Sequence, residues 1–178
     1  VILVHMANPP SFFGRSIYYG PDGKNLNRVY PGKADGTVSE RIAAALMREV
    51  VLKSTHLADM HCGDGNESLR PYSYWMISGN PEVDEASREM ALAYGFDHIV
   101  VDRDRPRDPN AAAYTANAAI LSGRPAITTE SGGMGQTDEA SVRGHVTGAL
   151  SLIAHLGIMK APSARVEKPL WVIRSEVA

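Results

Sequence analysis

The chain has 178 residues, of which 44% are hydrophobic and 21% are charged, and its formal net charge is -2. This length and composition predict one globular domain and give no indication of a nucleic-acid-binding surface. Apolar runs are too short for a membrane span, which needs roughly 20 residues, and the single cysteine, Cys62, excludes an internal disulfide. We therefore expect a cytoplasmic protein that binds neither nucleic acid nor membrane; a homo-oligomer is compatible with these features.

Strand-like and helix-like patterns alternate along the chain. Continuous apolar runs of strand length predict strands at 1–7, 56–61, 72–78, 98–102 and 125–130, and a further strand begins near Trp171. Helical spacing and capping residues predict helices at 37–52, 81–94, 111–121 and 138–156. This alternation predicts an α/β fold with a mainly parallel or mixed central sheet and helices on both faces.

Local signals predict where some helices begin and end and which apolar residues share a face. Thr37 and Glu40 have the spacing of a capping box, and Pro81 after Asn80 marks the start of another helix. Gly95 marks the end of that helix. The last helix carries Val142, Val146, Ala149 and Ile153 on one face, and Gly157 marks its end.

Two of the predicted strands end in residues that can do chemistry. His61 ends the strand at 56–61, and Glu130 ends the strand at 125–130 just before two glycines in the next three positions. Because ligands gather beyond the carboxyl ends of parallel strands, both side chains could belong to one site. The alternatives stay open at this point: His61 could be a core histidine bonded to a carbonyl group, and Glu130 could cap a helix or join an ion pair.

The neighbours of His61 also have more than one interpretation. Asp59 lies two residues before His61 and therefore shares its face of the strand, where it could orient the imidazole. A solvated or helix-facing Asp59 is the alternative. Cys62 leaves the strand on the opposite face, and we expect it to be a buried free thiol.

Asn27 and Arg28 stand side by side near the end of a loop that is rich in turn residues, 14–32. The planar guanidinium group of arginine can bind a carboxylate through two parallel hydrogen bonds, and an adjacent amide adds a donor. The pair is therefore a candidate for binding a substrate carboxylate, although an isolated Asn-Arg pair is more often only part of the surface.

Three motifs, in order along the chain, resemble those of a known family. They are ANPPSFFGRSIYYGPDGKNLNRVYPG (7–32), DMH (59–61) and TESGG (129–133). Together they resemble the succinylglutamate desuccinylase/aspartoacylase family of the zinc carboxypeptidase clan, and the resemblance covers roughly residues 1 to 160. It implies a mixed α/β sheet that carries one zinc ion and hydrolyses an amide bond next to a carboxylate-bearing group.

The resemblance also implies roles for individual residues. His61 corresponds to a zinc-ligating histidine, and Glu130 to the carboxylate that takes a proton from the attacking water. Asn27 and Arg28 correspond to the pair that holds the substrate carboxylate, and Arg15 to an arginine that polarises the scissile carbonyl. These roles are chemically consistent, because zinc lowers the pKa of a bound water to about 7 and a carboxylate can then move the proton.

The other two zinc ligands of the family are absent from this sequence. They come from a His-x-x-Glu pair that precedes the first motif, and none of the six histidines here has a glutamate three residues later. The chain starts inside an apolar run and stops soon after a strand begins, so we expect truncation at both ends, with the missing ligands upstream of Val1. We expect a zinc-hydrolase core at 1–160, followed by a linker and the start of a C-terminal β-rich domain at 161–178.

The sequence thus favours a zinc-dependent deacylase that cleaves an N-acyl amino acid or a similar carboxylate-bearing small molecule. Two alternatives stay open, namely a zinc carboxypeptidase-like peptidase and a metal-free binding domain that has lost the site. With only one of the expected zinc ligands, we expect the chain by itself to be inactive.

Overall fold

The computed structural model describes residues 1–18 and 21–173 and divides into two compact units. Unit 1 comprises Val1–Leu57 and Arg105–Arg124, and unit 2 comprises Ala58–Asp104 and Pro125–Ala178. The proposed boundary between 160 and 161 stays a prediction. No helix in the described part of the chain has both the length and the apolar character needed to cross a membrane.

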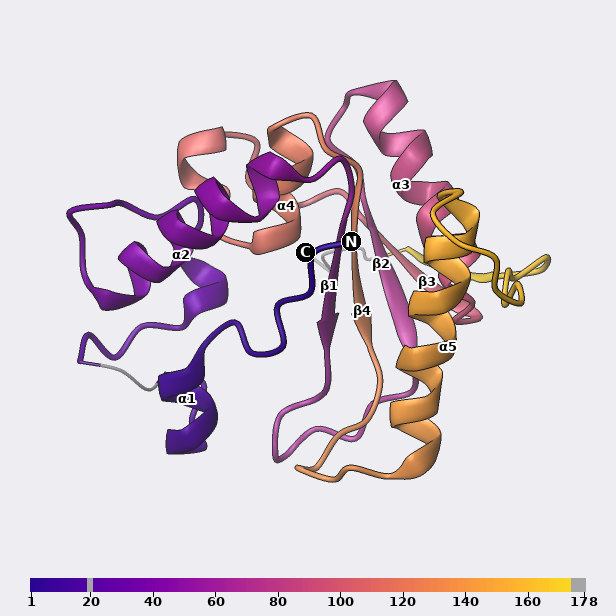
Figure 1. The fold of residues 1–178 in the computed structure, drawn as a ribbon, viewed down its shortest axis with the longest axis horizontal. Helices are drawn as coiled ribbons and strands as arrows, with labels where there is room; N and C mark the ends of the chain where they lie inside the picture. Colours follow the sequence, from indigo (N-terminus) through magenta and orange to yellow (C-terminus); the bar gives the residue numbers. More distant parts are fainter. Residues whose placement is uncertain (19–20, 174–178) are drawn as a thin grey trace. The chain divides into compact units, whose positions relative to one another are not determined.

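The elements alternate along the chain much as their patterns predict (Figure 1). They are α1 (Pro9–Gly14), η1 (Leu26–Arg28), α2 (Val38–Glu49), η2 (Val51–Lys53), β1 (Leu57–His61), β2 (Tyr72–Met76), α3 (Pro81–Tyr94), β3 (His98–Asp102), η3 (Pro109–Ala111), α4 (Thr115–Leu121), β4 (Ala126–Glu130), α5 (Glu139–His155) and β5 (Leu170–Ile173). The predicted strand near Trp171 corresponds to β5, and its continuation over 174–178 lies outside the described residues.

The described strands form a mixed sheet in the order β1-β4-β2-β3-β5. β2 and β5 each pair in parallel with β3, whereas β2 and β4 are antiparallel. Just beyond β1 and β4, the Ser131 N–H donates to the His61 carbonyl (3.1 Å) and the Gly63 N–H to the Gly132 carbonyl (2.9 Å). From the first of these bonds to the second, the residue numbers rise in both segments, so β1 and β4 are parallel. The predicted mixed α/β sheet is confirmed, and it brings the ends of β1 and β4 together.

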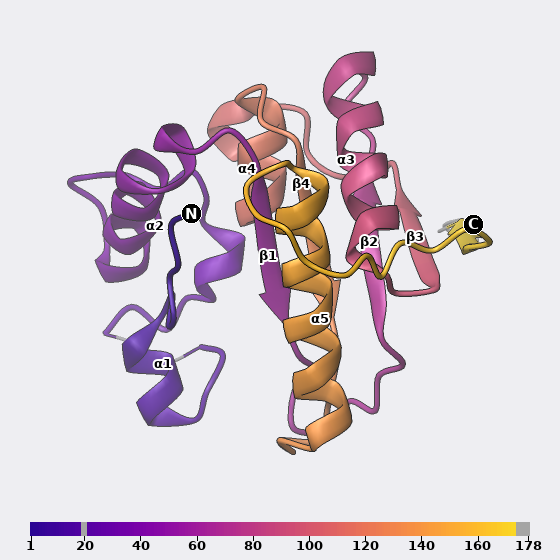
Figure 2. The same cartoon turned by 45° about the vertical axis from the view of Figure 1, so that its right-hand side comes forward.

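Helices α3 and α5 pack on each other and on the sheet of unit 2 (Figure 2). The start of α3 follows its sequence signals, since the Asn80 side chain accepts a hydrogen bond from the Glu82 N–H and Pro81 occupies the first turn. Gly95 ends the helix with a φ of 99°, a conformation that glycine adopts without steric cost. The apolar core of this unit consists of Met90, Ala91, Leu92, Ala93, Tyr94, Phe96, Ile99, Ile127 and Leu152.

The apolar face that the sequence marks on α5 is not buried along its whole length, because Val142 and Val146 are 52% and 53% exposed. The buried positions are instead Gly148, Ser151 and Leu152. A Cβ atom on Gly148 would lie only 2.4 Å from the Tyr94 ring, so close approach to α3 selects this face. Hydropathy alone could not reveal that requirement.

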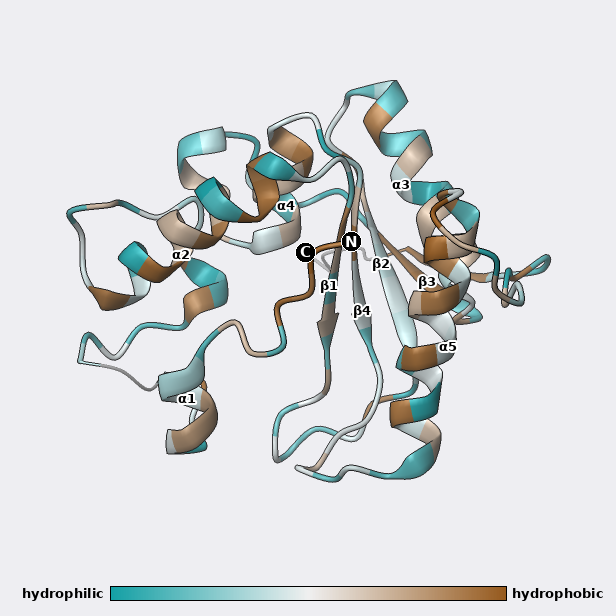
Figure 3. Cartoon of the chain, in the orientation of Figure 1, coloured by the Kyte–Doolittle hydropathy of each residue, from teal (hydrophilic) through white to brown (hydrophobic). Residues whose placement is uncertain are grey.

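Residues 1–7 do not form the predicted strand. The segment is an apolar coil in which Val1 and Leu3 are 75% and 73% exposed (Figure 3). A strand needs a neighbour to satisfy its backbone groups, and no strand of the described sheet pairs with this segment. An apolar run predicts burial, but it does not supply the partner.

In unit 1, the start of α2 is also correctly predicted. The Glu40 carboxylate accepts the Thr37 N–H (2.8 Å), as expected for a capping box. From the preceding loop, Asp22 accepts hydrogen bonds from the Ser39 N–H (2.8 Å) and hydroxyl (2.9 Å). These bonds tie the loop that carries Asn27 to the start of a helix. The helix predicted at 111–121 is shorter, because η3 and a turn precede α4.

Candidate functional site

The end of β1 positions His61 against Asp59. The His61 Nε2 atom lies 3.1 Å from Asp59 Oδ1, and the two side chains are 32% and 20% exposed. The alternation of a strand places residues i and i+2 on one face, which explains the contact. The second carboxylate oxygen, Asp59 Oδ2, is buried without a hydrogen-bond partner. Asp59 is therefore not a solvated residue, and it restricts the orientation of the imidazole ring.

These two residues have the chemistry of one ligand of a metal site. Histidines that bind metals commonly direct one ring nitrogen to the ion and the other to a carboxylate. Since Nε2 faces Asp59, a metal bound by His61 would use Nδ1. Within residues 1–18 and 21–173, however, no group of three or more His, Cys, Asp and Glu side chains is arranged to hold an ion. His61 fits a metal as a single ligand, and the described residues do not complete the set.

Glu130 ends β4 beside this pair, and its carboxyl group has an unusual pKa. Burial raises the pKa of Glu130 from 4.5 to about 7, and His61 opposes the shift while Asp59 and further carboxylates support it. Its strand partner is Tyr72, the first residue of β2. Tyr72 also lies in the environment of Glu130. Burial, the Tyr74 hydroxyl group and the charge of Glu130 raise the pKa of Tyr72. From the sequence, the aromatic residues of this strand are interpreted mainly as packing, with the alternative that a tyrosine lines a pocket.

The loops that follow β1 and β4 are bonded to each other and surround Glu130. The Met134 N–H donates to the Glu67 carbonyl (2.8 Å), and a Cβ atom on Gly133 would lie 2.3 Å from the same oxygen. Glycine at 133 therefore permits the close approach of the two loops. This contact brings Asp64 and Glu67 near enough to raise the pKa of Glu130. The TESGG motif thus has a structural reason for its glycines.

Cys62 is not the buried thiol that its position predicts. It is exposed, because it lies one residue beyond the end of β1, and β1 is at one end of the described sheet.

In unit 1, Asn27 is held by the start of α4. Its Oδ1 atom accepts hydrogen bonds from the Thr115 N–H (2.8 Å) and hydroxyl (3.1 Å). Its own backbone N–H donates to Asn25 Oδ1 (2.9 Å). The amide oxygen is thus used as a structural acceptor, so the group that Asn27 can offer a ligand is its Nδ2 donor.

Arg28 is exposed and stacks on Tyr114. Its guanidinium carbon lies 4.5 Å from the ring centroid, and its Nη1 donates to the Asn27 carbonyl (2.7 Å). Arg105 approaches the same ring at 3.8 Å. Among the described residues of unit 1, no carboxylate forms an ion pair with Arg28. The ring and the carbonyl therefore orient a cation that is accessible to an anionic ligand.

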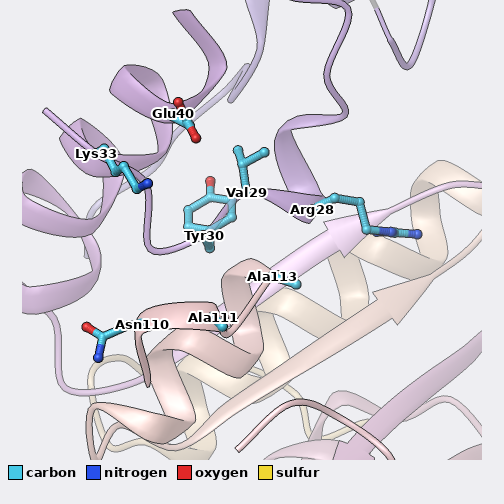
Figure 4. Close-up of a pocket in the computed structure, with 9 residues that line it drawn as sticks. Arg28, Val29, Tyr30, Lys33, Glu40, Asn110, Ala111 and Ala113 are labelled. Carbon is cyan, nitrogen blue, oxygen red and sulfur yellow. The ribbon is translucent and has the colours of Figure 1, made fainter. Parts of the chain in front are cut away.

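A pocket of about 260 Å³ lies beside this arginine, lined by residues of the segments 28–33 and 110–113 and by Glu40. In Figure 4 the Arg28 guanidinium points away from Lys33 and Glu40. Arg28 therefore borders the pocket without directing its charge into it.

Arg15 lies at the end of α1 with a left-handed backbone, φ 51°. It is exposed, and among the described residues no hydrogen bond joins it to Asn27 or Arg28. The structure therefore brings His61, Asp59 and Glu130 together in unit 2 and Asn27 and Arg28 together in unit 1.

Comparisons with known proteins found a matching family model and a curated relative. The family model described as the succinylglutamate desuccinylase/aspartoacylase catalytic domain matches residues 1–156. The N-alpha-acetyl-L-2,4-diaminobutyric acid deacetylase of Halomonas elongata is 27% identical over 169 residues, which are 95% of this chain and 48% of that enzyme.

Solved structures show the same fold. The product-bound ectoine utilization protein EutE (DoeB) from Ruegeria pomeroyi aligns with a TM-score of 0.82 and 25% identity, over 96% of this chain and 50% of that chain. A succinylglutamate desuccinylase/aspartoacylase from Rhodobacter sphaeroides aligns with a TM-score of 0.82 and 21% identity, over 96% and 51% of the two chains. This chain spans about half the length of the relatives it matches. Because the family model matches most of its residues, the chain belongs to the succinylglutamate desuccinylase/aspartoacylase family.

Proposed function

We propose that this chain supplies catalytic groups to a hydrolase that removes the acyl group from an N-acyl amino acid. The observation that carries the proposal is Glu130, which ends β4 beside His61 and whose pKa is raised to about 7 by burial. A carboxyl group with such a pKa can accept a proton from water and return it to a leaving amine at neutral pH. The deacetylase of Halomonas elongata, by its name, acts on an N-acetyl amino acid, which supports this choice of substrate class.

Zinc is the metal that we propose for this site, with His61 as one ligand. When bound, zinc supplies a Lewis acid that makes water nucleophilic near neutral pH. Asp59 would hold the imidazole in the orientation and tautomer that the metal requires, through the 3.1 Å contact at Nε2. The remaining ligands would come from outside the described residues.

Asn27 and Arg28 would bind the substrate carboxylate. Arg28 offers a planar pair of donors oriented by Tyr114, and Asn27 offers its Nδ2 group because its oxygen is engaged with Thr115. Arg15 would polarise the scissile carbonyl, as the resemblance implies. Two fixed donors and an uncompensated cation favour an anionic substrate over a neutral amide.

The decisive experiment compares an acid with its ester in the full-length protein. We expect hydrolysis of N-acetyl-L-2,4-diaminobutyric acid and other N-acetyl amino acids, and a KM at least tenfold higher for the corresponding methyl esters. Equal rates on acid and ester would contradict carboxylate binding. No hydrolysis of any N-acyl amino acid by the zinc-loaded protein would overturn the proposed function.

The zinc proposal has its own test. His61→Ala should lower zinc affinity at least tenfold, measured by competition with a chromogenic chelator. His155, an exposed histidine at the end of α5, provides the control, and His155→Ala should bind zinc as the unmodified protein does. Unchanged zinc affinity in His61→Ala would identify His61 as a structural histidine.

A further inference from the structure

In unit 2, the carbonyl oxygen of His61 at the end of β1 is contacted by two other segments of the chain. It accepts the Ser131 N–H (3.1 Å) from the segment after β4 and lies 2.8 Å from Nε2 of His145 on α5. A carbonyl oxygen can only accept a hydrogen bond, so this nitrogen of His145 carries a proton. No pattern in the sequence indicates this contact between His145 and His61, which are separated by 84 positions.

His145 is itself held on its other side. Its Nδ1 atom lies 2.8 Å from the hydroxyl group of Tyr94 on α3, whose side chain is almost fully buried. With the ring proton on Nε2, Nδ1 is left to accept the hydrogen bond of the Tyr94 hydroxyl group. A chain of two hydrogen bonds therefore runs from α3 through α5 to the end of β1.

Two glycines on α5 allow this geometry. A Cβ atom on Gly148 would lie 2.4 Å from the Tyr94 ring, and one on Gly144 would lie 3.3 Å from Phe96 and 3.6 Å from Ser131. Glycine at these positions, four residues apart, lets the helix approach both aromatic rings. His145 follows the first of them and so reaches β1. The ring of His145 also makes edge contacts with Tyr94 and Phe96, at 6.2 and 5.8 Å between centroids.

We propose that His145 is a positioning residue, which holds the His61 carbonyl against α5 and thereby fixes the His61 imidazole at the end of β1. β1 lies at one end of the described sheet with β4 as its strand neighbour, and the bond from His145 adds a restraint from α5 to the one that the segment after β4 provides. Metal and catalytic sites lose efficiency when a ligand is displaced by a fraction of an ångström. The inference rests on the proposed role of His61 and adds to it the group that holds this residue in place.

The test compares substitutions on the same helix in the full-length protein. His145→Phe preserves a planar ring but removes both hydrogen bonds, and His145→Gln retains a donor and an acceptor. We expect His145→Phe to lower zinc affinity and kcat about tenfold each with KM little changed, and His145→Gln to recover most of both. Tyr94→Phe removes one link of the chain, so it should produce a smaller loss of about threefold.

Ser151→Ala is the matched control. The Ser151 hydroxyl also joins α5 to α3, by donating to the Ala93 carbonyl (2.6 Å), and within the described residues no hydrogen bond joins it to β1. We expect Ser151→Ala to lower the melting temperature as His145→Phe does, without altering zinc affinity or kcat. Equal effects of the two variants on kcat and zinc affinity would overturn the positioning role. Unchanged kcat and zinc affinity in His145→Phe would overturn it as well.

Hydrogen exchange separates this inference from the proposed function. The Ser131 amide donates to the His61 carbonyl, so its exchange rate reports the restraint at the end of β1 without substrate or metal. We expect faster exchange at Ser131 in His145→Phe and no change in Ser151→Ala. If the unmodified protein does not hydrolyse N-acyl amino acids, the proposed function fails while this result still supports His145 as the restraint; unchanged exchange in His145→Phe would overturn the inference.

Discussion

Two regions of the molecule adapt polar groups to chemistry in opposite ways. They are the ends of β1 and β4 in unit 2 and the Asn27–Arg28 segment in unit 1. Glu130 is largely buried among other acidic groups, and its proton affinity is raised. Arg28 is exposed and is oriented by an aromatic ring and a carbonyl group. The comparison teaches that a proton-transfer group needs an environment that shifts its pKa, whereas an anion-binding group needs orientation and access.

The same contrast appears in how the two segments are held. Beyond β1 and β4, backbone hydrogen bonds join the two loops directly, with glycine at 133 where a side chain would collide. In unit 1, side chains hold the backbone instead, as Asp22 does for Ser39 and Asn27 for Thr115. Substitutions at the strand ends should therefore act on the chemical step, and substitutions in the loop on substrate binding.

The largest expected effect is the loss of the proton-transfer group. Glu130→Gln keeps the shape of the side chain but cannot accept a proton, so kcat should fall by about 10²-fold or more with zinc still bound. Steady-state kinetics and metal analysis of the full-length protein would measure both. Glu67→Gln is the control, because it removes a neighbouring charge and should change kcat only a few-fold. Near-normal turnover in Glu130→Gln would assign Glu130 a structural role.

A second prediction concerns stability against pH and uses the same substitution in metal-free protein. The unfolded chain loses the Glu130 proton near the ordinary pKa of 4.5, whereas the folded chain retains it until about 7. Between these values the folded state binds more protons, so the stabilising contribution of Glu130 is complete below 4.5 and is lost as pH rises. Relative to Glu130→Gln, the unmodified protein should lose on the order of 2 to 3 kcal/mol between pH 5 and pH 8.

Urea denaturation of both proteins at a series of pH values would measure this difference. A constant difference in the free energy of unfolding would show that the carboxyl group titrates normally, and the contrast between the two regions would then disappear.

The sequence predicted the elements that combine a periodic pattern with terminal signals. α3 has the Asn80 cap, Pro81 in its first turn and Gly95 at its end, and it formed where expected. Hydropathy alone was less dependable: the apolar runs that became β1 to β4 were correctly predicted, whereas residues 1–7 have no strand partner in the described sheet and the apolar face of α5 is only partly buried. Local signals report backbone geometry, whereas burial depends on the neighbours that the fold provides.

The candidate site shows the same limit. His61 and Glu130 could be predicted to meet, because the carboxyl ends of parallel strands share one edge of a sheet. The contacts of His145 with His61 and of Asn27 with Thr115 could not, because no strand order or helix signal in the sequence places these pairs, 84 and 88 positions apart, beside each other. Nothing in the sequence near a polar residue indicates which distant backbone group it will bind.

A smaller effect is expected at Arg28. Arg28→Lys keeps the charge but loses the planar pair of donors and the stacking on Tyr114, so KM for an N-acetyl amino acid should rise about tenfold with kcat little changed. Arg41→Lys, at an exposed position of α2 in the same unit, is the control and should leave KM unchanged. A loss of stability with unaltered KM would show that Arg28 supports the fold rather than the substrate.

The smallest effect is expected at Asn27, where one side chain serves both structure and binding. Asn27→Asp keeps the oxygen that accepts the Thr115 N–H and hydroxyl, so stability should change by less than about 0.5 kcal/mol. It replaces the Nδ2 donor by a second oxygen, which repels a carboxylate, and KM should rise about fivefold. Asn27→Ala removes both functions and should also lower stability by about 1 kcal/mol, the usual effect of losing a helix cap. Thermal unfolding and steady-state kinetics on both variants would separate the two roles, and an Asn27→Asp protein with normal KM would leave Asn27 with the structural role alone.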